Sequence, residues 1–198
     1  EEFRARALRG PDLFNHLERT GAPMMPRDIG LVVGHTGAAA GDRVLDAGTG
    51  TGILAAYLGR LGADVTTYEI DAAFAEVARD NMEVAGVADR VDVRTGDITD
   101  EIDDLTGGEP FDLLTLDTED APEVVADAAD LLAPGGFLAV YSPFVENSRA
   151  SVEAAEAAGL AAIETVETIQ RELTVDDRGT RPSTAGVGHT GYLTFARR

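Results

Sequence analysis

Three glycines stand close together in Asp46-Ala47-Gly48-Thr49-Gly50-Thr51-Gly52, directly after a short apolar run. Because glycine has no side chain, the backbone of such a turn can pass close to a ligand. The turn predicts a site for a nucleotide-like ligand, with these contacts: Asp46, Gly48, Thr49, Gly50, Thr51 and Gly52. A purely structural tight turn is the alternative. The stretch 50–55 also fits the looser G-x-G-x-x-A fingerprint of dinucleotide sites.

Acidic residues end three of the expected strands, at the edge where ligands bind in open α/β sheets. Glu69 can accept hydrogen bonds from both hydroxyls of a ribose, and Ile70 follows it as a further contact. Asp97, preceded by Gly96, can accept a hydrogen bond from an adenine amino group. Asp117 ends the next strand, although each acid alone could equally cap a helix or face solvent. Together they favour S-adenosylmethionine over a dinucleotide, because a dinucleotide site requires the acid at Glu69 but not one at Asp97.

The apolar pattern predicts the elements that would position these residues. Helices are expected at 28–33, 53–61, 72–84, 122–132 and 151–158, and strands at 44–45, 65–68, 91–94, 111–116, 137–141, 162–173 and 191–196, with a turn at 176–182. Strands that alternate with helices indicate a parallel sheet covered on both faces. The last two strands are expected as an antiparallel hairpin at one sheet edge. The predicted fold class is therefore α/β, with a doubly wound, Rossmann-like sheet that is mostly parallel.

Length and composition limit the domain organisation and the cofactors. The 198 residues suffice for one α/β domain, expected at 41–198, preceded by a helical lead-in at 1–40. There is no run of about 18 apolar residues and no basic start followed by an apolar stretch, so we expect a cytoplasmic protein without membrane contact. With no cysteine and three scattered histidines, the chain is not expected to bind a metal ion.

The formal net charge of −20 comes from 36 acids and 16 basic residues, and every basic residue is arginine. A dense carboxylate surface without lysine indicates a halophilic source, because high salt shortens the range of self-repulsion. The charge is uneven: residues 41–170 hold 28 acids and six arginines, whereas both ends are neutral or slightly positive. An anionic partner would approach the ends, unless the ends are simply less exposed.

Two levels of family resemblance follow from these motifs. The chain resembles class I S-adenosylmethionine-dependent methyltransferases in residues 44–52, Glu69, Gly96-Asp97 and 132–136. Within that superfamily it is similar to the archaeal and bacterial tRNA adenine-N1 methyltransferases that modify position 57 or 58 in the T-loop. Met25-Pro26-Arg27-Asp28 resembles the Tyr-Pro-Lys-Asp segment of that family, and residues 181–197 resemble its C-terminal signature.

The resemblance covers residues 20–198 and implies S-adenosylmethionine as the cofactor, tRNA as the partner and a homotetramer as the assembly. The small β-rich N-terminal domain typical of that family is not visible in this sequence, which begins with Glu1 instead of Met. Residues 1–40 are therefore expected to include the remnant of a linker to such a domain.

The resemblance places Asp117 at the catalytic aspartate and Tyr141 at a tyrosine near the target base. Adenine N1 has an in-plane lone pair and needs no strong base to become a nucleophile. A carboxylate that accepts a hydrogen bond from the exocyclic amino group gains strength as positive charge develops there, and Asp117 is expected to act in this way. For Tyr141, a buried aromatic residue whose hydroxyl finds a partner is an equal alternative.

Several positions depart from the family pattern. After the catalytic aspartate the family commonly has Leu-Pro-x-Pro-Trp, whereas this chain has Thr118-Glu119-Asp120-Ala121-Pro122. Asn147 replaces a frequent glutamine and is expected to cap a helix or to contact cofactor or base. His189 is expected to fix the geometry of a loop. The alternatives are a methyltransferase of proteins or small molecules, such as an isoaspartate or corrin-ring enzyme, and a catalytically weak RNA-binding homologue.

Overall fold

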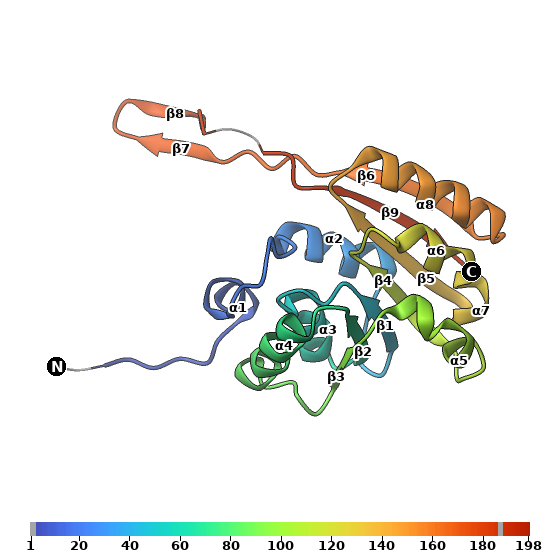
Figure 1. Ribbon diagram of the computed structural model, residues 1–198. Helices are drawn as coiled ribbons and strands as arrows, with labels where there is room; N and C mark the ends of the chain where they lie inside the picture. Colours follow the sequence, from blue (N-terminus) through green and yellow to red (C-terminus); the bar gives the residue numbers. More distant parts are fainter. Residues whose placement is uncertain (1–2, 186–187) are drawn as a thin grey trace.

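A computed structural model describes residues 3–185 and 188–198 (Figure 1). Its main sheet has seven strands in the order β3-β2-β1-β4-β5-β9-β6. The strands are β1 (Arg43–Ala47), β2 (Asp64–Glu69), β3 (Val91–Thr95), β4 (Phe111–Leu116), β5 (Leu132–Ser142), β6 (Ala161–Glu167) and β9 (Tyr192–Arg197). β1 to β5 are parallel, and β9 runs antiparallel between β5 and β6. This topology confirms the predicted doubly wound sheet with an antiparallel C-terminal pair.

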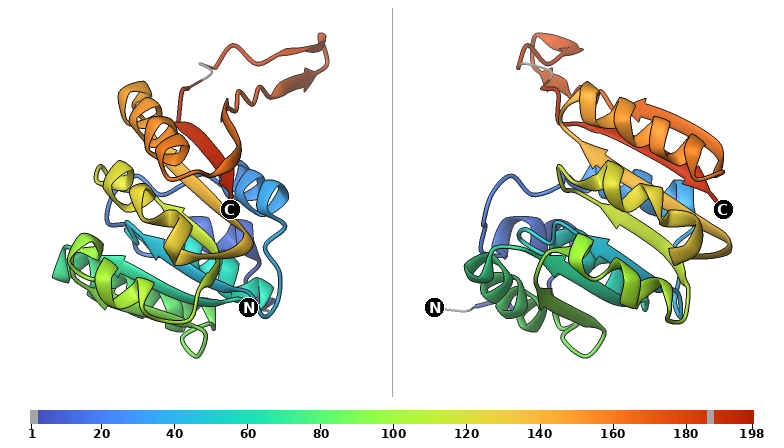
Figure 2. Two further views of the ribbon diagram at one scale, coloured as in Figure 1. Left: turned by 90° about the vertical axis from the view of Figure 1, so that its right-hand side faces the viewer. Right: turned by 45° about the vertical axis from the view of Figure 1, so that its right-hand side comes forward.

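Helices cover both faces of the sheet, as Figure 2 shows. They are α1 (Gly10–His16), α2 (Pro26–Thr36), α3 (Ile53–Leu61), α4 (Ala72–Ala85), α5 (Ile102–Thr106), α6 (Ala121–Ala126), α7 (Ala128–Leu131) and α8 (Val145–Ala157). α1 to α4 pack on one face and α5 to α8 on the other. Successive strand residues point to opposite faces, so Val44 and Leu113 join the first layer while Leu45 and Leu114 join the second.

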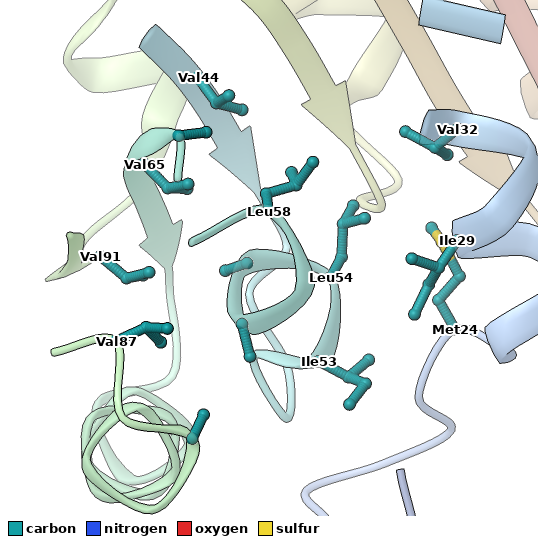
Figure 3. Close-up of a cluster of buried hydrophobic side chains, with 14 of the residues drawn as sticks. Met24, Ile29, Val32, Val44, Ile53, Leu54, Leu58, Val65, Val87 and Val91 are labelled. Carbon is teal, nitrogen blue, oxygen red and sulfur yellow. The ribbon is translucent and has the colours of Figure 1, made fainter. Parts of the chain in front are cut away.

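The hydrophobic core beneath α1 to α4 includes part of the N-terminal segment. Met24 and two residues of α2, Ile29 and Val32, pack beside Ile53 and Leu54 of α3 (Figure 3). The expected lead-in therefore shares a core with the sheet, which places residues near 24 within reach of the ends of the strands. Its role as a linker remains a prediction.

Two expected elements differ from the structure. The helix expected at 122–132 is divided into α6 and α7 and ends at Leu131, because Leu132 begins β5, pairs with Phe111 and is fully buried. At such an apolar junction, periodicity alone does not separate a buried helix residue from a strand residue. The strand expected at 162–173 ends at Glu167, and most of the expected turn belongs to a separate hairpin of β7 (Leu173–Asp176) and β8 (Gly179–Pro182). This hairpin projects away from the main sheet (Figure 1).

The other differences concern helix limits. α8 begins at Val145, earlier than the expected 151, and α2 extends beyond the expected 28–33 at both ends. α1 and α5, each of at most seven residues, were not predicted, because so few residues carry little periodic signal. α4 agrees closely with its prediction: Asp71 caps its first turn by accepting two backbone hydrogen bonds, and Gly86 ends it with φ +71°.

In residues 3–185 and 188–198, no helix is both long and apolar enough to span a bilayer. Within the same ranges, no group of three or more His, Cys, Asp or Glu side chains is arranged to hold a metal ion.

Candidate active site

A cavity of about 340 Å³ opens at the carboxyl ends of the central strands. Its walls come from the N-terminal segment, the glycine turn, the ends of β2 and β3 and the loop after β4. The lining residues are Thr20, Gly21, Ala22, Pro23, Met24, Asp46, Ala47, Gly48, Thr49, Gly50, Thr51, Ile53, Leu54, Tyr68, Glu69, Ile70, Phe74, Gly96, Asp97, Ile98, Asp117, Thr118 and Asp120. Every residue predicted to contact the cofactor is among them except Gly52, and Tyr141 also lies outside the lining.

The glycine turn is packed tightly against the neighbouring strand ends. Gly48 has φ +84°, and a Cβ atom there would overlap the backbone carbonyl of Asp117. Gly50 has φ +52° and donates its N–H to Glu69 Oε2 at 2.8 Å. Gly52 precedes α3, and a Cβ atom on it would collide with a methionine side chain of α4. Gly48 and Gly52 therefore let the turn pack against the Asp117 backbone and α4, while Gly50 supplies a positive φ and the N–H that holds Glu69.

Asp46 lies beneath this turn at the end of β1 and is 3% exposed. Its carboxylate oxygens accept hydrogen bonds from the hydroxyls of Thr67 on β2, at 2.6 Å, and of Thr115 on β4. Thr49 Oγ1 lies 2.5 Å from Thr67 Oγ1 and continues the network into the turn. Burial raises the pKa of Asp46, and the two threonine hydroxyl bonds oppose the rise. Asp46 thus links the ends of β1, β2 and β4 through the hydroxyls of Thr67 and Thr115. Neither threonine was predicted from the sequence to belong to the site.

Glu69 ends β2 with its carboxylate held in place by the backbone. Oε2 accepts the Gly50 N–H at 2.8 Å, and Oε1 accepts the Asp71 N–H at 3.1 Å. Each carboxylate oxygen can accept a second hydrogen bond. Because Glu69 also lines the cavity, its two oxygens can accept hydrogen bonds from neighbouring hydroxyls of a bound ribose.

Asp97 caps a short helix and also lines the cavity. Its Oδ1 accepts the Thr99 hydroxyl at 2.7 Å and the Thr99 N–H at 2.9 Å, which caps the 3-10 helix Ile98–Asp100. These two hydrogen bonds, the hydroxyl bond first, lower the pKa of Asp97. The other carboxylate oxygen is left for a ligand donor. Exposed apolar side chains of Ile70 and Phe74 line the cavity as well, and they suit the faces of a planar base.

Asp117 follows β4 and is partly buried in the cavity wall. Its N–H donates to the Ala47 carbonyl at 2.8 Å, which fixes the backbone beside the glycine turn. Burial, and then the negative charge of Asp46, raise the pKa of Asp117 to about 7. A cation bound in the cavity would favour the carboxylate form of this group.

Tyr141 lies on β5, at the same edge of the sheet as Asp117 on the adjacent strand. Its ring is partly buried against Gly191, where a Cβ atom would overlap the ring. Burial first, followed by the charges of Asp117 and Asp28, raises the pKa of Tyr141 to about 12, and a hydrogen bond with Thr190 opposes the rise. The phenol is therefore neutral throughout the physiological pH range.

The N-terminal wall of the cavity is the main feature that the sequence reasoning missed. Residues 20–24 form this wall. Asn81 of α4 holds the segment: it exchanges two hydrogen bonds with the backbone of Glu18 and donates a third to the Thr51 carbonyl, each at 2.9 Å. Residues 20–24 carry neither an acidic nor a glycine-rich pattern that would predict a site. The one signal in the sequence is Asn81, a polar residue on the apolar face of a predicted helix, which needs a hydrogen-bond partner when it is buried.

Comparison with known proteins identifies the family. The sequence matches the family described as tRNA methyltransferase complex GCD14 subunit over residues 11–180. The chain belongs to this GCD14 family. A tRNA (adenine(57)-N(1)/adenine(58)-N(1))-methyltransferase of Methanocaldococcus jannaschii is 32% identical over 94% of this chain and 75% of its own length. A tRNA (adenine(58)-N(1))-methyltransferase of Thermus thermophilus is 30% identical over 92% of this chain and 72% of its own.

Solved structures share the GCD14-family fold. An S-adenosylmethionine-dependent O-methyltransferase of Thermotoga maritima superposes with a TM-score of 0.87 and 25% identity, covering 96% of this chain and 71% of that one. A tRNA (m1A58) methyltransferase of Aquifex aeolicus has a TM-score of 0.81 at 23% identity, covering 93% and 73%. The fold is therefore that of S-adenosylmethionine-dependent methyltransferases.

As a GCD14-family member, the chain is an S-adenosylmethionine-dependent methyltransferase, and its cavity suits this cofactor. Gly48 lets the turn pack against the Asp117 backbone, and Gly50 has a positive φ that a side chain would disfavour, so the turn can follow the cavity wall. The carboxylates of Glu69 and Asp97 present acceptors for ribose and adenine donors. The acidic cavity wall, which includes Asp117, favours a ligand that carries a positive sulfonium charge.

Asn147 and His189 lie outside the cavity lining of this GCD14-family chain and hold the surrounding loops. Asn147 lies within the first turn of α8 and donates its amide to the Glu119 carbonyl at 2.7 Å, so it neither caps α8, whose N-cap is Phe144, nor lines the cofactor cavity. His189 places one ring nitrogen 2.8 Å from Glu167 Oε1 and the other 2.9 Å from a carbonyl that follows β5. As expected, His189 fixes the loop before β9.

Proposed function

We propose that this chain transfers a methyl group from S-adenosylmethionine to N1 of an adenine in the T-loop of tRNA. The observation that carries the proposal is the position of Asp117 in the wall of the cofactor cavity, with Tyr141 at the same edge of the adjacent strand. The M. jannaschii and T. thermophilus relatives, at 32% and 30% identity, are both named as tRNA adenine-N1 methyltransferases.

The proposed role of Asp117 is electrostatic. Adenine N1 forms a bond to the methyl carbon with its in-plane lone pair while the carbon–sulfur bond breaks, and the electrons of that bond return to sulfur. Positive charge then spreads over the adenine ring and onto its exocyclic amino group. The Asp117 carboxylate accepts a hydrogen bond from this amino group, and the bond strengthens as the charge develops. No residue has to remove a proton from N1.

We propose cofactor contacts for the predicted residues that line the cavity. Glu69 accepts hydrogen bonds from the ribose hydroxyls, Asp97 accepts one from the adenine amino group, and Ile70 packs against the adenine. The backbone between Gly48 and Gly50 passes close to the cofactor. Asp46 acts from beneath the turn, because both of its carboxylate oxygens already accept threonine hydroxyls.

The test is methyl transfer from a labelled donor to an unmodified tRNA transcript in molar salt, with the methylated base identified by mass spectrometry. We expect N1-methyladenine in the T-loop. Asp117→Asn should lower kcat by about 100-fold, because the neutral amide loses the charge that stabilises the transition state. The affinity for S-adenosylmethionine, measured by calorimetry, should fall less than kcat, because Asp117 is one of several acids in the cavity wall. The matched control is Asp130→Asn, which neutralises an exposed aspartate of α7 and should leave kcat unchanged.

Two outcomes would replace the proposal. Labelling of a protein or a small molecule, with the T-loop left unmodified, would identify a methyltransferase of that substrate class. Binding of cofactor and tRNA without turnover on any tRNA would identify an RNA-binding homologue with weak or no catalysis.

We also propose a cytoplasmic homo-oligomer of four copies from a halophilic source. Family resemblance supports the number of copies, and a tRNA substrate supports the location. On the β7–β8 hairpin, Leu173 and Val175 are 63% and 75% exposed, which suits burial against another copy. Light scattering in molar salt measures the mass, and a monomer at micromolar concentration would contradict this assembly.

A further inference from the structure

Phe144 presents an exposed aromatic ring at the rim of the candidate active site. It lies two residues beyond Ser142, where β5 ends, and is 68% exposed. Val145, which follows it, is 54% exposed. Because β5 runs parallel to β4, both strands end at the edge of the sheet where Asp117 lines the cavity. An apolar surface is therefore displayed beside the place that the substrate has to approach.

A side-chain contact joins the start of α8 to the wall of the cavity. Asn147, in the first turn of α8, donates its amide to the Glu119 carbonyl at 2.7 Å. Thr118 and Asp120, on either side of Glu119, line the cavity. Phe144 is the N-cap residue of the same helix. Its ring is thus held next to the cavity wall, although it does not belong to the cavity lining.

Hydrogen bonds hold the backbone of Phe144 in place. The Ser142 hydroxyl accepts the Phe144 N–H and donates to the Phe144 carbonyl, each at 3.1 Å. The same carbonyl accepts the Ser148 N–H at 3.2 Å. His189 Nε2 donates to the carbonyl of Pro143, the preceding residue, at 2.9 Å. The ring is therefore exposed on a backbone that is already fixed, so the binding of a ligand to its face costs little additional ordering.

The charges around Phe144 limit the kind of ligand that can bind there. Glu119, in the loop after β4, and Glu146, in the first turn of α8, are both exposed. Their carboxylates repel a phosphate group, and molar salt weakens phosphate contacts further. Stacking of a base on an aromatic ring, in contrast, requires no charge on the protein. Phe144 therefore suits a nucleobase and not the sugar-phosphate backbone of a nucleic acid.

We propose that Phe144 is a substrate-binding residue that stacks on a base adjacent to the target adenine and thereby holds the RNA over the cavity. This inference rests on the proposed function and deepens it. The target adenine has to leave its stack before N1 can reach a methyl group in the cavity, and its departure uncovers the face of a neighbouring base. Unstacked bases of RNA loops are commonly bound on aromatic side chains. The Phe144 ring, one strand away from Asp117, covers that face.

Steady-state kinetics on a tRNA transcript compare three substitutions of Phe144. Phe144→Ala removes the ring, Phe144→Leu keeps an apolar side chain without an aromatic face, and Phe144→Trp enlarges the face. We expect the alanine and leucine substitutions to raise KM for tRNA by about tenfold at unchanged kcat, as for the loss of one stacked base. Phe144→Trp should keep the wild-type KM or lower it. Because the ring is exposed, the midpoint of thermal unfolding and the affinity for S-adenosylmethionine should not change.

The matched control is Leu61, an apolar residue at the end of α3 that is 42% exposed. Since α3 begins at the glycine turn, Leu61 lies at the opposite edge of the sheet, and Leu61→Ala should leave KM unchanged. Salt gives a second control. The loss of a phosphate contact would flatten the dependence of log KM on log salt concentration, whereas the loss of stacking should shift that line by a constant amount.

Fluorescence measures the same contact without turnover. The chain contains no tryptophan, so Phe144→Trp introduces a single indole fluorophore. We expect a T-loop RNA to quench its emission, and the same RNA with abasic sites on both sides of the target adenine to quench it much less. Leu61→Trp, at the opposite edge of the sheet, should be quenched by neither RNA.

Equal KM values for the wild type and Phe144→Ala, or equal quenching by the intact and the abasic RNA, would overturn the inference. A wild-type KM in Phe144→Leu would overturn it as well, because an apolar contact would then suffice. Dissociation of Phe144→Ala into smaller species, measured by light scattering, would assign the ring to an interface between copies instead. If the wild-type protein methylates no tRNA, the proposed function fails, and the fluorescence of Phe144→Trp still decides whether a base stacks at this position.

Discussion

Asp117 shows how one partly buried carboxyl group connects this reaction to pH. Its ordinary pKa of 3.8 is raised to about 7 in the folded protein, by burial and then by the charge of Asp46. Between pH 3.8 and about pH 7, Asp117 keeps its proton in the folded protein but releases it in the unfolded chain. The contribution of Asp117 to the free energy of unfolding is therefore greatest below about pH 4. This contribution is lost as the pH rises through about 7. The proposed catalytic role of Asp117 needs the opposite form, because the negative charge of the carboxylate would stabilise the positive charge that develops on the adenine.

We expect Asp117→Asn to remove this pH dependence. Asparagine resembles the protonated carboxyl group, so the variant and the wild type should differ least below about pH 4, where Asp117 is protonated in both the folded and the unfolded wild type. The stability advantage of the variant over the wild type should be greater near about pH 8 than near about pH 5, by about 2 to 3 kcal/mol. Urea denaturation at constant salt measures both values, with Asp130→Asn as the exposed control. A difference that stays constant with pH would show that Asp117 does not titrate in this range.

At the scale of elements, Asn81 attaches one segment to another. It lies on α4, is buried, and forms hydrogen bonds with both the segment following α1 and the glycine turn before α3. The Asn81 amide therefore joins the segment that leads into the N-terminal wall to the glycine turn that lines the cavity. Thr20 also donates its N–H to Thr51 Oγ1 at 3.4 Å, and Met24 is packed in the core, so Asn81 is one of three contacts that hold the wall.

We expect Asn81→Ala to destabilise the protein by about 2 kcal/mol, because it leaves buried backbone groups without partners. It should also weaken S-adenosylmethionine binding by about tenfold, since the wall would no longer be held in place. Calorimetric titration and thermal unfolding measure the two effects. Asn15→Ala, which removes an exposed amide bonded to the Pro11 carbonyl, is the control and should alter neither. Unchanged cofactor affinity in Asn81→Ala would show that the wall is not part of the binding site.

At the scale of the whole molecule, charge dominates. A net charge of −20 on 198 residues gives strong self-repulsion, and the acids lie mainly in the α/β region between residues 41 and 170. Salt screens this repulsion over distances that shrink to about 3 Å at molar concentration. Stability and tRNA binding consequently respond to salt in opposite directions, because phosphate contacts weaken as salt rises.

We expect the midpoint of thermal unfolding to rise by about 10 °C between low salt and about 2 M NaCl, as repulsion among the carboxylates is screened. The control is sucrose in low salt, at the concentration that gives the viscosity of the NaCl solution, because sucrose stabilises compact states without screening charge. An equal rise in sucrose would assign the effect to exclusion of the solute from the protein surface.

The sequence alone was sufficient to predict those features that depend on residues close together in the chain. The glycine turn, Glu69 at the end of β2, and Asp117 at the end of β4 were all predicted at the positions where they line the cavity. Alternating strands and helices predicted the sheet for the same reason: backbone geometry and period-two or period-3.6 burial are local properties. The junction at Leu132 was wrong, because there local apolarity is the same for either element.

Only the tertiary structure decided which distant residues meet. The threonines around Asp46 come from β2 and β4, and the N-terminal wall reaches the cavity through Asn81. Thr190 and Asp28, which are 162 positions apart, are brought together because α2 packs against β5 and β9. Hydrogen bonds between such residues leave no periodic trace in the chain, since each partner's spacing along the sequence is unrelated to its distance in space. The sequence by itself therefore determined the cofactor edge and its acids, while the folded packing determined how Asp117 and Tyr141 are held.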